Sequence, residues 1–245
     1  MFLCQIDSCR RAIDAAADAT ERPRCETHCV TDIWRLVEIE RTTLADFLET
    51  LSPSEWHVQS LCAAWTVQCT AAHVAWGNTV PIHQTALAIV RAGFRANRAN
   101  AQLGQKYGCN EPPAIIARLR DTASSRRLTP GTKPIDALAD ILLHDIDIRE
   151  PLGKPRTMPA EAFGLATTHV AGLGFPISLA YGSKPKAIAR GLHLVADDAD
   201  WSIGKGPAVH GSASALLRAL TGRPVRPEEL TGPGAATIYD RLPLR

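Results

Sequence analysis

The chain has 245 residues, of which 45% are hydrophobic and 21% are charged, and its formal net charge at neutral pH is +2. This composition is typical of a globular protein with enough chain for one large or two modest domains. The small net charge, without a basic run that contains aromatic residues, argues against nucleic acid as a partner. No stretch approaches the roughly 20 apolar residues of a membrane span, and the first residues lack a signal-peptide pattern, so we expect a cytoplasmic protein with no membrane partner.

Four of the seven cysteines lie in the first thirty residues. Cys4 and Cys9, followed by Cys25 and His28, have the general form of a small zinc knuckle, in which soft ligands hold a segment too short to build a core. Residues 1–30 are therefore predicted to be a separate cysteine-rich segment with a structural zinc site. Free thiols on a poorly ordered leader are the alternative, because the stretch between the two ligand pairs is long and rich in alanine.

Residues 31–155 are predicted to form a helical bundle. Thr31 and Thr66 are candidate N-caps, and Pro81 ends or kinks the second helix. Short links between four or so helices favour an antiparallel arrangement. Apolar residues at helical spacing predict these helices at about residues 31–52, 66–81, 83–106, 112–119 and 135–148.

Residues 156–245 have a different character and are predicted to be a small α+β domain. A helix is expected from Pro159 to about residue 172. Residues 191–196 alternate between polar and apolar like a strand, and residues 201–203 and 208–210 resemble short partner strands. Ser212 is a candidate cap for a helix over residues 213–220.

The helix over residues 135–148 carries two polar stripes. At about 100° per residue, Asp140, His144 and Asp147 share one narrow stripe, while Asp145 and Arg149 lie on another side. A surface helix needs only one solvated face. If Asp145 and Arg149 supply that face, the other stripe points into the bundle, where an unpaired charge is costly and a bound metal is one remedy.

The spacing between Asp140 and His144 places a carboxylate and an imidazole on adjacent turns, where both can reach one ion. A hydrogen-bonded pair or a solvated pair is the simpler explanation of the same spacing. A third ligand must come from another helix, and spacing does not identify it. His73 is the best candidate because its neighbours are apolar, although a lone helical histidine is usually a core residue. Asp147 is expected either to orient the ring of His144 without binding the metal itself or to pair with Arg149.

Three segments, residues 60–73, 143–153 and 191–223, together resemble the actinobacterial maleylpyruvate isomerase family. The first includes Trp65-Thr-Val and ends at His73, and the second begins Leu143-His-Asp-Ile-Asp. The third contains Trp201-Ser-Ile-Gly-Lys-Gly and Leu220-Thr-Gly-Arg. The resemblance implies a mainly α fold, with a DinB-like antiparallel four-helix bundle followed by a small α+β C-terminal domain.

The same resemblance implies that His73, Asp140 and His144 bind a divalent metal, commonly zinc, and that mycothiol is a cosubstrate. The expected function is an isomerase or a thiol S-transferase that joins a small thiol to an electrophile. Two differences from the family leave the reaction open. Gln68-Cys69 replaces the Arg-Asp of many relatives, and Asp140 is shorter than the glutamate of the isomerase itself. The alternative is a noncatalytic metal-binding or ligand-binding module of the same fold.

Two basic residues of the predicted C-terminal domain, Arg190 and Arg218, are candidates for binding an anionic substrate across the domain junction. Basic residues are more often solvated. His193 and His210 lie in strand-like segments, where exposure on one face of a sheet is the expected explanation.

Overall fold

The computed structural model describes residues 32–93, 96–129, 131–175, 178 and 181–242. The predicted zinc knuckle of Cys4, Cys9, Cys25 and His28, and with it the predicted segment 1–30, lie outside the described residues. No helix in the described part of the chain is long and apolar enough to cross a membrane.

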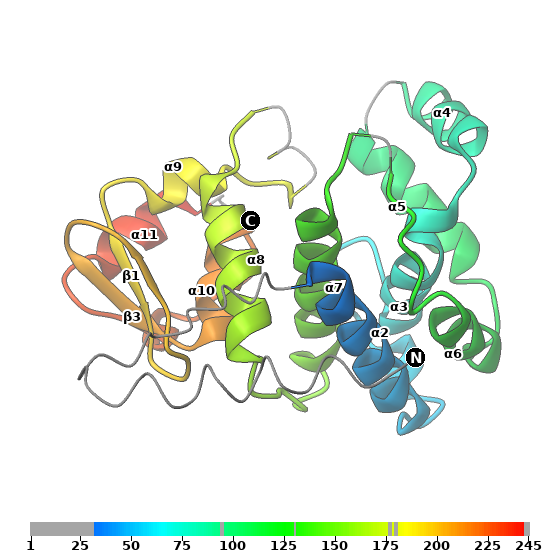
Figure 1. Cartoon of the computed structure of the whole chain (residues 1–245), viewed down its shortest axis with the longest axis horizontal. Helices are drawn as coiled ribbons and strands as arrows, with labels where there is room; N and C mark the ends of the chain where they lie inside the picture. The colour runs from blue at the N-terminus through cyan, green and yellow to red at the C-terminus, as the bar shows by residue number, and fades with distance from the viewer. Residues whose placement is uncertain (1–31, 94–95, 130, 176–177, 179–180, 243–245) are drawn as a thin grey trace, which may run out of the picture. The chain divides into compact units, whose positions relative to one another are not determined.

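Four helices form the bundle that holds the candidate site (Figure 1). They are α2 (Ile33–Glu49), α3 (Val67–Trp76), α6 (Pro112–Asp121) and α7 (Pro134–Arg149). Helices α2 and α3 each pack against both α6 and α7, so the four close around a common core. Fully buried apolar side chains from all four helices fill this core, among them Leu44, Ala71, Leu119 and Leu142.

The N-terminal ends of the bundle helices follow from local sequence. The side chain of Asp32 accepts a hydrogen bond from the backbone N–H of Trp34 and caps α2, so the predicted cap at Thr31 is wrong by one residue. Thr66 caps α3 as predicted, accepting from the N–H of Cys69. The short 3₁₀ turns η1 (Glu55–His57) and η2 (Gly77–Thr79) flank α3 in the chain.

The predicted single helix over residues 83–106 is wrong, because the structure has two helices there. Helix α4 (Ile82–Arg91) ends before Gly93, whose φ of 64° is incompatible with a right-handed helix, and α5 (Ala96–Tyr107) follows. Apolar periodicity runs through both helices and did not reveal the break. Helix α5 packs against α3, and α4 packs against α5 outside the bundle.

The C-terminal region combines helices with a small sheet. Helix α8 (Ala160–Gly172) is followed by α9 (Pro185–Ala189), α10 (Ala213–Leu220), η4 (Pro227–Glu229) and α11 (Ala235–Arg241). The strands β1 (His193–Ala196), β2 (Ser202–Gly204), β3 (Ala208–Gly211) and β4 (Leu230–Thr231) lie in the order β2-β1-β3-β4. β1 and β3 are parallel, and the other two pairings are antiparallel. Strand β4 and helices α9 and α11 were not predicted.

Gly204 allows β2 to approach β1. Its φ is 88°, and a Cβ at this position would lie 2.2 Å from the carbonyl oxygen of Leu192. Only glycine fits there. The register that pairs Leu194 with Ile203 therefore depends on this residue.

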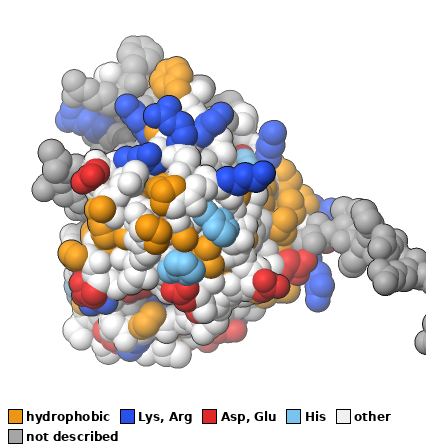
Figure 2. All heavy atoms as spheres, turned by 90° about the vertical axis from the view of Figure 1, so that its left-hand side faces the viewer, with side chains coloured by type: hydrophobic (Ala, Val, Ile, Leu, Met, Phe, Trp, Pro, Cys, Tyr) orange, Lys and Arg blue, Asp and Glu red, His pale blue; other side chains and the backbone are white. Residues whose placement is uncertain are grey.

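One face of the sheet is buried and the other is accessible. Leu194 and Val209 are fully buried against the helices, so His193 and His210 point to the opposite face by strand alternation. The side chain of His210 is hydrogen-bonded to Asp197 at 3.1 Å. Figure 2 shows this end of the protein, where histidine and apolar side chains lie on the surface and Lys and Arg side chains gather along one edge.

Helix α8 links the bundle to the sheet, because it packs against α7 on one side and against α9 and α10 on the other. Phe163 of α8 is fully buried and contacts Trp201 edge-on, with ring centroids 5.2 Å apart. A helical bundle followed by a small α+β unit is thus confirmed as the fold class. The predicted domains 31–155 and 156–245 share one hydrophobic core across α7 and α8, and their independence as domains stays a prediction.

Replacement of Phe163 by alanine tests this shared core. Phe163→Ala is expected to lower the free energy of unfolding by about 3–5 kcal/mol, because it leaves a cavity between α8 and the sheet. Leu165→Ala on the same helix is the control; its side chain is partly exposed, and the expected cost is below about 1 kcal/mol. Denaturant titration followed by circular dichroism measures both. Equal losses for the two variants would contradict the assignment of Phe163 to the core.

Candidate metal centre

The three residues predicted to bind a metal lie together in the structure. His73 comes from α3, and Asp140 and His144 come from successive turns of α7. Nε2 of His144 and Nε2 of His73 lie 3.4 Å and 3.8 Å from Oδ1 of Asp140, and one ligand atom from each residue lies within 4.8 Å of the others. Two imidazole nitrogens and a carboxylate oxygen form the donor set of an open zinc site, so these side chains fit the ion. That they bind a metal stays a prediction.

The members of the group differ in their access to solvent. The side chain of Asp140 is 41% exposed, whereas the side chains of His73 and His144 are 12% and 7% exposed. A small molecule can therefore approach along Asp140, while the two imidazoles are held by the protein interior.

The polar stripe of α7 that holds Asp145 and Arg149 is buried, contrary to the sequence interpretation. Asp145 and Arg149 were predicted to supply the solvated face, but they are 1% and 9% exposed. Asp145 accepts hydrogen bonds from Arg149 (2.7 Å) and Arg156 (2.7 Å), and Arg156 also pairs with the buried Glu40 of α2. Arg149 lies one turn from Asp145 on the same helix, but Arg156 lies beyond the helix and Glu40 is 116 residues from Arg156, so helical periodicity could not indicate this buried network.

Asp147 holds His144 in place. Nδ1 of His144 lies 2.9 Å from Oδ2 of Asp147, so the ring presents Nε2 to Asp140 and His73. Asp147 is fully buried and also accepts two hydrogen bonds from Arg223, from Nε at 3.1 Å and from Nη2 at 2.9 Å. The structure favours the orienting role predicted for Asp147 over a pair with Arg149.

Buried charges set the protonation of this group. Burial raises the pKa of Asp147, but the positive charge of Arg223 and the hydrogen bonds from His144 and Arg223 outweigh it and hold this pKa well below its usual range. Burial lowers the pKa of Arg223, and the charge of Asp147 reverses this and raises it. Asp147 is therefore an anion and Arg223 a cation at neutral pH.

In Asp140 and His144 without a metal, the effect of burial on each pKa is likewise outweighed by the charge and hydrogen bonds of the partner. Burial raises the pKa of Asp140, yet the charge of His144 and hydrogen bonds from His144 and His73 lower it well below its usual range. Burial lowers the pKa of His144, but the charge of Asp140 and hydrogen bonds to Asp140 and Asp147 raise it well above its usual range. Without a metal, His144 is thus protonated at neutral pH.

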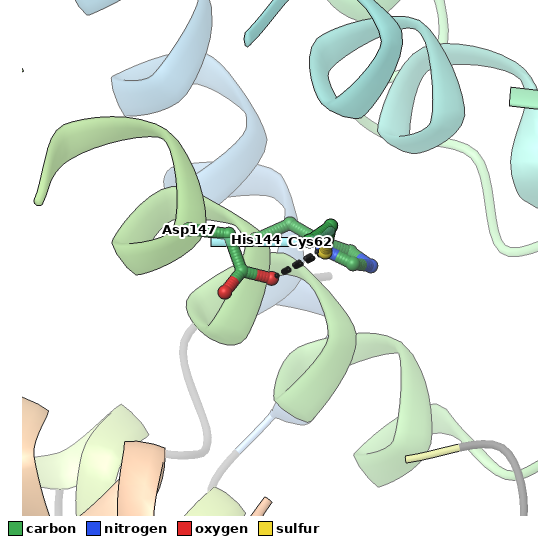
Figure 3. A group of neighbouring side chains, drawn as sticks. All are labelled: Cys62, His144 and Asp147. Atoms are coloured by element: carbon green, nitrogen blue, oxygen red, sulfur yellow. Dashed lines mark hydrogen bonds and ion pairs between the residues drawn. The ribbon is translucent and has the colours of Figure 1, made fainter. Parts of the chain in front are cut away.

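Cys62 lies beside Nδ1 of His144. Its Sγ donates a hydrogen bond to Oδ2 of Asp147 at 3.0 Å and lies 3.8 Å from Nδ1 of His144 (Figure 3). The segment that carries Cys62 is fixed to α7 by a hydrogen bond from the N–H of Leu61 to the backbone carbonyl of Asp147. This bond satisfies a carbonyl near the C-terminal end of the helix.

Trp65 forms the wall beside the two histidines. Its ring stacks on His73 with centroids 4.8 Å apart and lies 5.9 Å from the ring of His144. Its indole N–H donates to the carbonyl of Ala101 in α5. Gly104 makes this position possible, because a Cβ there would lie 2.5 Å from the Trp65 ring.

Tyr181, from the chain between α8 and α9, lies near Asp140. Burial raises the pKa of its phenol, and the negative charges of Asp140 and Asp136 raise it further. The phenol is therefore neutral and can donate a hydrogen bond at neutral pH.

The two arginines predicted to bind substrate have other surroundings. Arg218 is buried, donates to the carbonyl of Pro224 and pairs with Glu229 at 2.5 Å. Arg190 is exposed, and its carbonyl accepts a hydrogen bond from Arg241. No contact of the described residues brings Arg190 or Arg218 to the histidine cluster, and their substrate-binding role stays a prediction.

Sequence reasoning missed three side chains of this site, namely Cys62, Arg223 and Trp65. Cys62 and Trp65 lie in the segment 60–73 that resembles the family, but nothing in their spacing indicates a place at the site. Arg223 is the last residue of the segment Leu220-Thr-Gly-Arg, which contributed to the family resemblance. That motif was the one signal able to indicate it.

Residues 37–140 match a family model described as the mycothiol maleylpyruvate isomerase N-terminal domain. This range includes His73 and Asp140 and ends before His144. Solved structures of a mycothiol-dependent maleylpyruvate isomerase and of its histidine-to-alanine mutant are similar to the chain, with TM-scores of 0.48 and 0.49. Each structure is 17% identical in sequence to this chain, and the match covers 83% of this chain and 92% of the chain in that structure. No curated protein sequence matches the chain.

Replacement of Gly104 by alanine tests the Trp65 wall. Gly104→Ala is expected to destabilise the protein by about 1–3 kcal/mol, since the new methyl group must displace the indole ring from His73. Gly172→Ala is the matched control, because nothing lies within 4 Å of a Cβ at that helical glycine. Thermal unfolding followed by tryptophan fluorescence distinguishes them. An unchanged stability for Gly104→Ala would show that Trp65 does not depend on this close approach.

The pKa of His144 predicts how zinc affinity depends on pH. Because this pKa is raised, a proton competes with the ion for His144, whereas Asp140 stays ionised. Zinc affinity is expected to fall as the pH is lowered, by up to about tenfold for each pH unit, because one proton must leave His144 for each ion bound. Competition with a chromophoric chelator, corrected for the chelator's own protonation, measures it. An affinity that does not change with pH would argue against His144 as a ligand.

Proposed function

We propose that this chain is a metal-dependent enzyme of low-molecular-weight-thiol chemistry, since residues 37–140 match the family model of the mycothiol maleylpyruvate isomerase N-terminal domain. The metal, which we take to be zinc, is held by His73, Asp140 and His144. The observation that carries the proposal is the convergence of these three side chains, of which the carboxylate is partly exposed. The proposed cosubstrate is mycothiol, after the family description, and the proposed location is the cytoplasm.

A bound zinc ion lowers the pKa of a thiol that shares its coordination, and three protein ligands leave a position open for one. The protein supplies the rest. Asp147 fixes the ring of His144 so that Nε2 faces Asp140, and Trp65 covers the ring of His73. These contacts hold the donor atoms in place before any ligand binds.

The C-terminal region completes the surroundings of the proposed metal ligands. Arg223 reaches Asp147 from the turn after α10, and Tyr181 lies close enough to Asp140 for the carboxylate charge to raise the pKa of the phenol. We therefore propose that substrate binds between the bundle and the C-terminal region. Tyr181 is the residue expected to donate a hydrogen bond to an oxygen of the electrophile.

The proposed reaction begins when a thiol loses its proton to solvent and its sulfur forms a bond to an electron-poor carbon of the electrophile. If that carbon belongs to a double bond conjugated to a carbonyl, the π electrons move toward the carbonyl and the former double bond becomes a single bond that can rotate. Return of these electrons expels the thiolate and restores the double bond as the isomer. If the electron pair instead takes a proton from solvent, the sulfur stays attached and the product is an S-conjugate. The site geometry supports thiol addition in both cases, and the electrophile decides between them.

Loss of His144 tests the proposal. His144→Ala is expected to lose about one zinc ion per chain and the zinc-dependent rate, because one of three ligands is removed. His57→Ala is the matched control, since His57 is exposed and lies in η1 outside the cluster. Zinc is measured by mass spectrometry of the purified proteins. Activity is measured as mycothiol-dependent isomerisation of maleylpyruvate and as conjugation of a fluorogenic electrophile.

Zinc bound by the wild type but not by His144→Ala, together with no thiol-dependent rate for either substrate, would favour the noncatalytic metal-binding module. Equal zinc content in wild type and His144→Ala would refute the assigned site.

A further inference from the structure

Two sets of metal-ligating atoms meet at His144. The outer group is His73, Asp140 and His144, and the inner group is Cys62, His144 and Asp147. In each group, one ligand atom from every residue lies within 4.8 Å of the others. Figure 3 shows Cys62 and His144 both directed at the carboxylate of Asp147. A thiol, an imidazole and a carboxylate are good zinc ligands, so donor chemistry alone does not decide which group an ion prefers.

The charge next to the inner group differs from that next to the outer group. Arg223 donates to both oxygens of Asp147 and its Nη2 lies 3.8 Å from Sγ of Cys62. The side chain of Arg223 is 10% exposed, so solvent screens its charge little. A divalent cation in the inner group would have to share Asp147 with this cation at contact distance.

The hydrogen bonds of His144 also disfavour a metal ion in the inner group. Its Nδ1 lies 2.9 Å from Oδ2 of Asp147, and a carboxylate oxygen accepts a hydrogen bond, so we assign the ring proton to Nδ1. A ligating nitrogen must offer a lone pair. The neutral ring then offers its lone pair from Nε2, on the side of Asp140 and His73.

In the described part of the chain, no lysine or arginine forms an ion pair with the outer group. Among the described residues, the only ion-pair partners of Asp140 are His73 and His144. The nearby Arg41 donates instead to the backbone carbonyls of Thr122 and Ser125. The negative charge of Asp140 is thus available to a metal.

We propose that the guanidinium of Arg223 closes the inner group to metal, so that an ion bound by this protein lies in the outer group. Arg223 acts as a positioning residue for the metal and a specificity determinant between two overlapping sites. The inference rests on the proposed metal binding.

Cobalt(II) titration of the full-length wild type is the first test. A cobalt ion bound by a thiolate gives an intense ultraviolet charge-transfer band, which nitrogen and oxygen ligands do not give. The part of that band that depends on Cys62 is obtained by subtracting the spectrum of Cys62→Ser, which removes contributions from the other cysteines. For the wild type this difference is expected to be zero, while His73→Ala is expected to lose about one cobalt ion per chain.

Variants of Arg223 supply the second test. Arg223→Met removes the cation and is expected to produce a band that disappears in the double variant with Cys62→Ser. Arg223→Lys keeps a positive charge and is expected to show no such band. Arg223→Met leaves Asp147 buried without its main partner, so cobalt is also expected to raise the melting temperature of this variant more than that of Arg223→Lys.

A Cys62-dependent band in the wild type would overturn the proposal, because the ion would then lie in the inner group, and zinc binding by the protein would still stand. A folded Arg223→Met that binds cobalt without this band would overturn the role of Arg223. If Arg223→Met does not fold, the comparison of wild type with Cys62→Ser and His73→Ala decides. A wild type with no His73-dependent ion would refute the proposed function, and the two Arg223 variants would still test the inner group.

Discussion

The candidate site depends on a buried ion pair between Asp147 and Arg223. A carboxylate that is fully excluded from water is costly unless its oxygens are all paired, and here Arg223, His144 and Cys62 supply the partners. One partner comes from α7, one from the segment before α3 and one from the turn after α10. The pairing of Asp147 thus joins the bundle to the C-terminal region and fixes the imidazole of His144.

The direction in which the site faces follows from this ion pair. Because Nδ1 of His144 is bonded to Asp147, Nε2 is the nitrogen that faces Asp140 and His73. Trp65 covers the histidine rings from another side and leaves Asp140 as the accessible member. One arrangement of charges therefore accounts for the ring orientation, for the direction of ligand approach and for the choice between the two ligand groups.

The fold could largely be predicted from the sequence, since apolar periodicity located the bundle helices and alternation located three strands. The break at Gly93 could not, because apolar spacing continues through it and the signal lies in one positive φ. The two stripes of α7 were separated correctly by periodicity, yet the burial of Asp145 was missed. Its partner Arg156 follows in the chain, but Glu40 is 116 residues away from that arginine. Helical spacing carries no information about such a partner.

For the site, the sequence by itself determined that Asp140 and His144 lie on adjacent turns of one helix, since a helical repeat of 3.6 residues fixes this locally. It made His73 a candidate through residue type and family resemblance. Only the tertiary structure decided that His73 meets them, that Cys62 lies beside His144, and that Arg223 pairs with Asp147 across 76 residues. Contacts of that separation depend on how helices and domains pack, and a buried charge selects its partner by packing rather than by spacing.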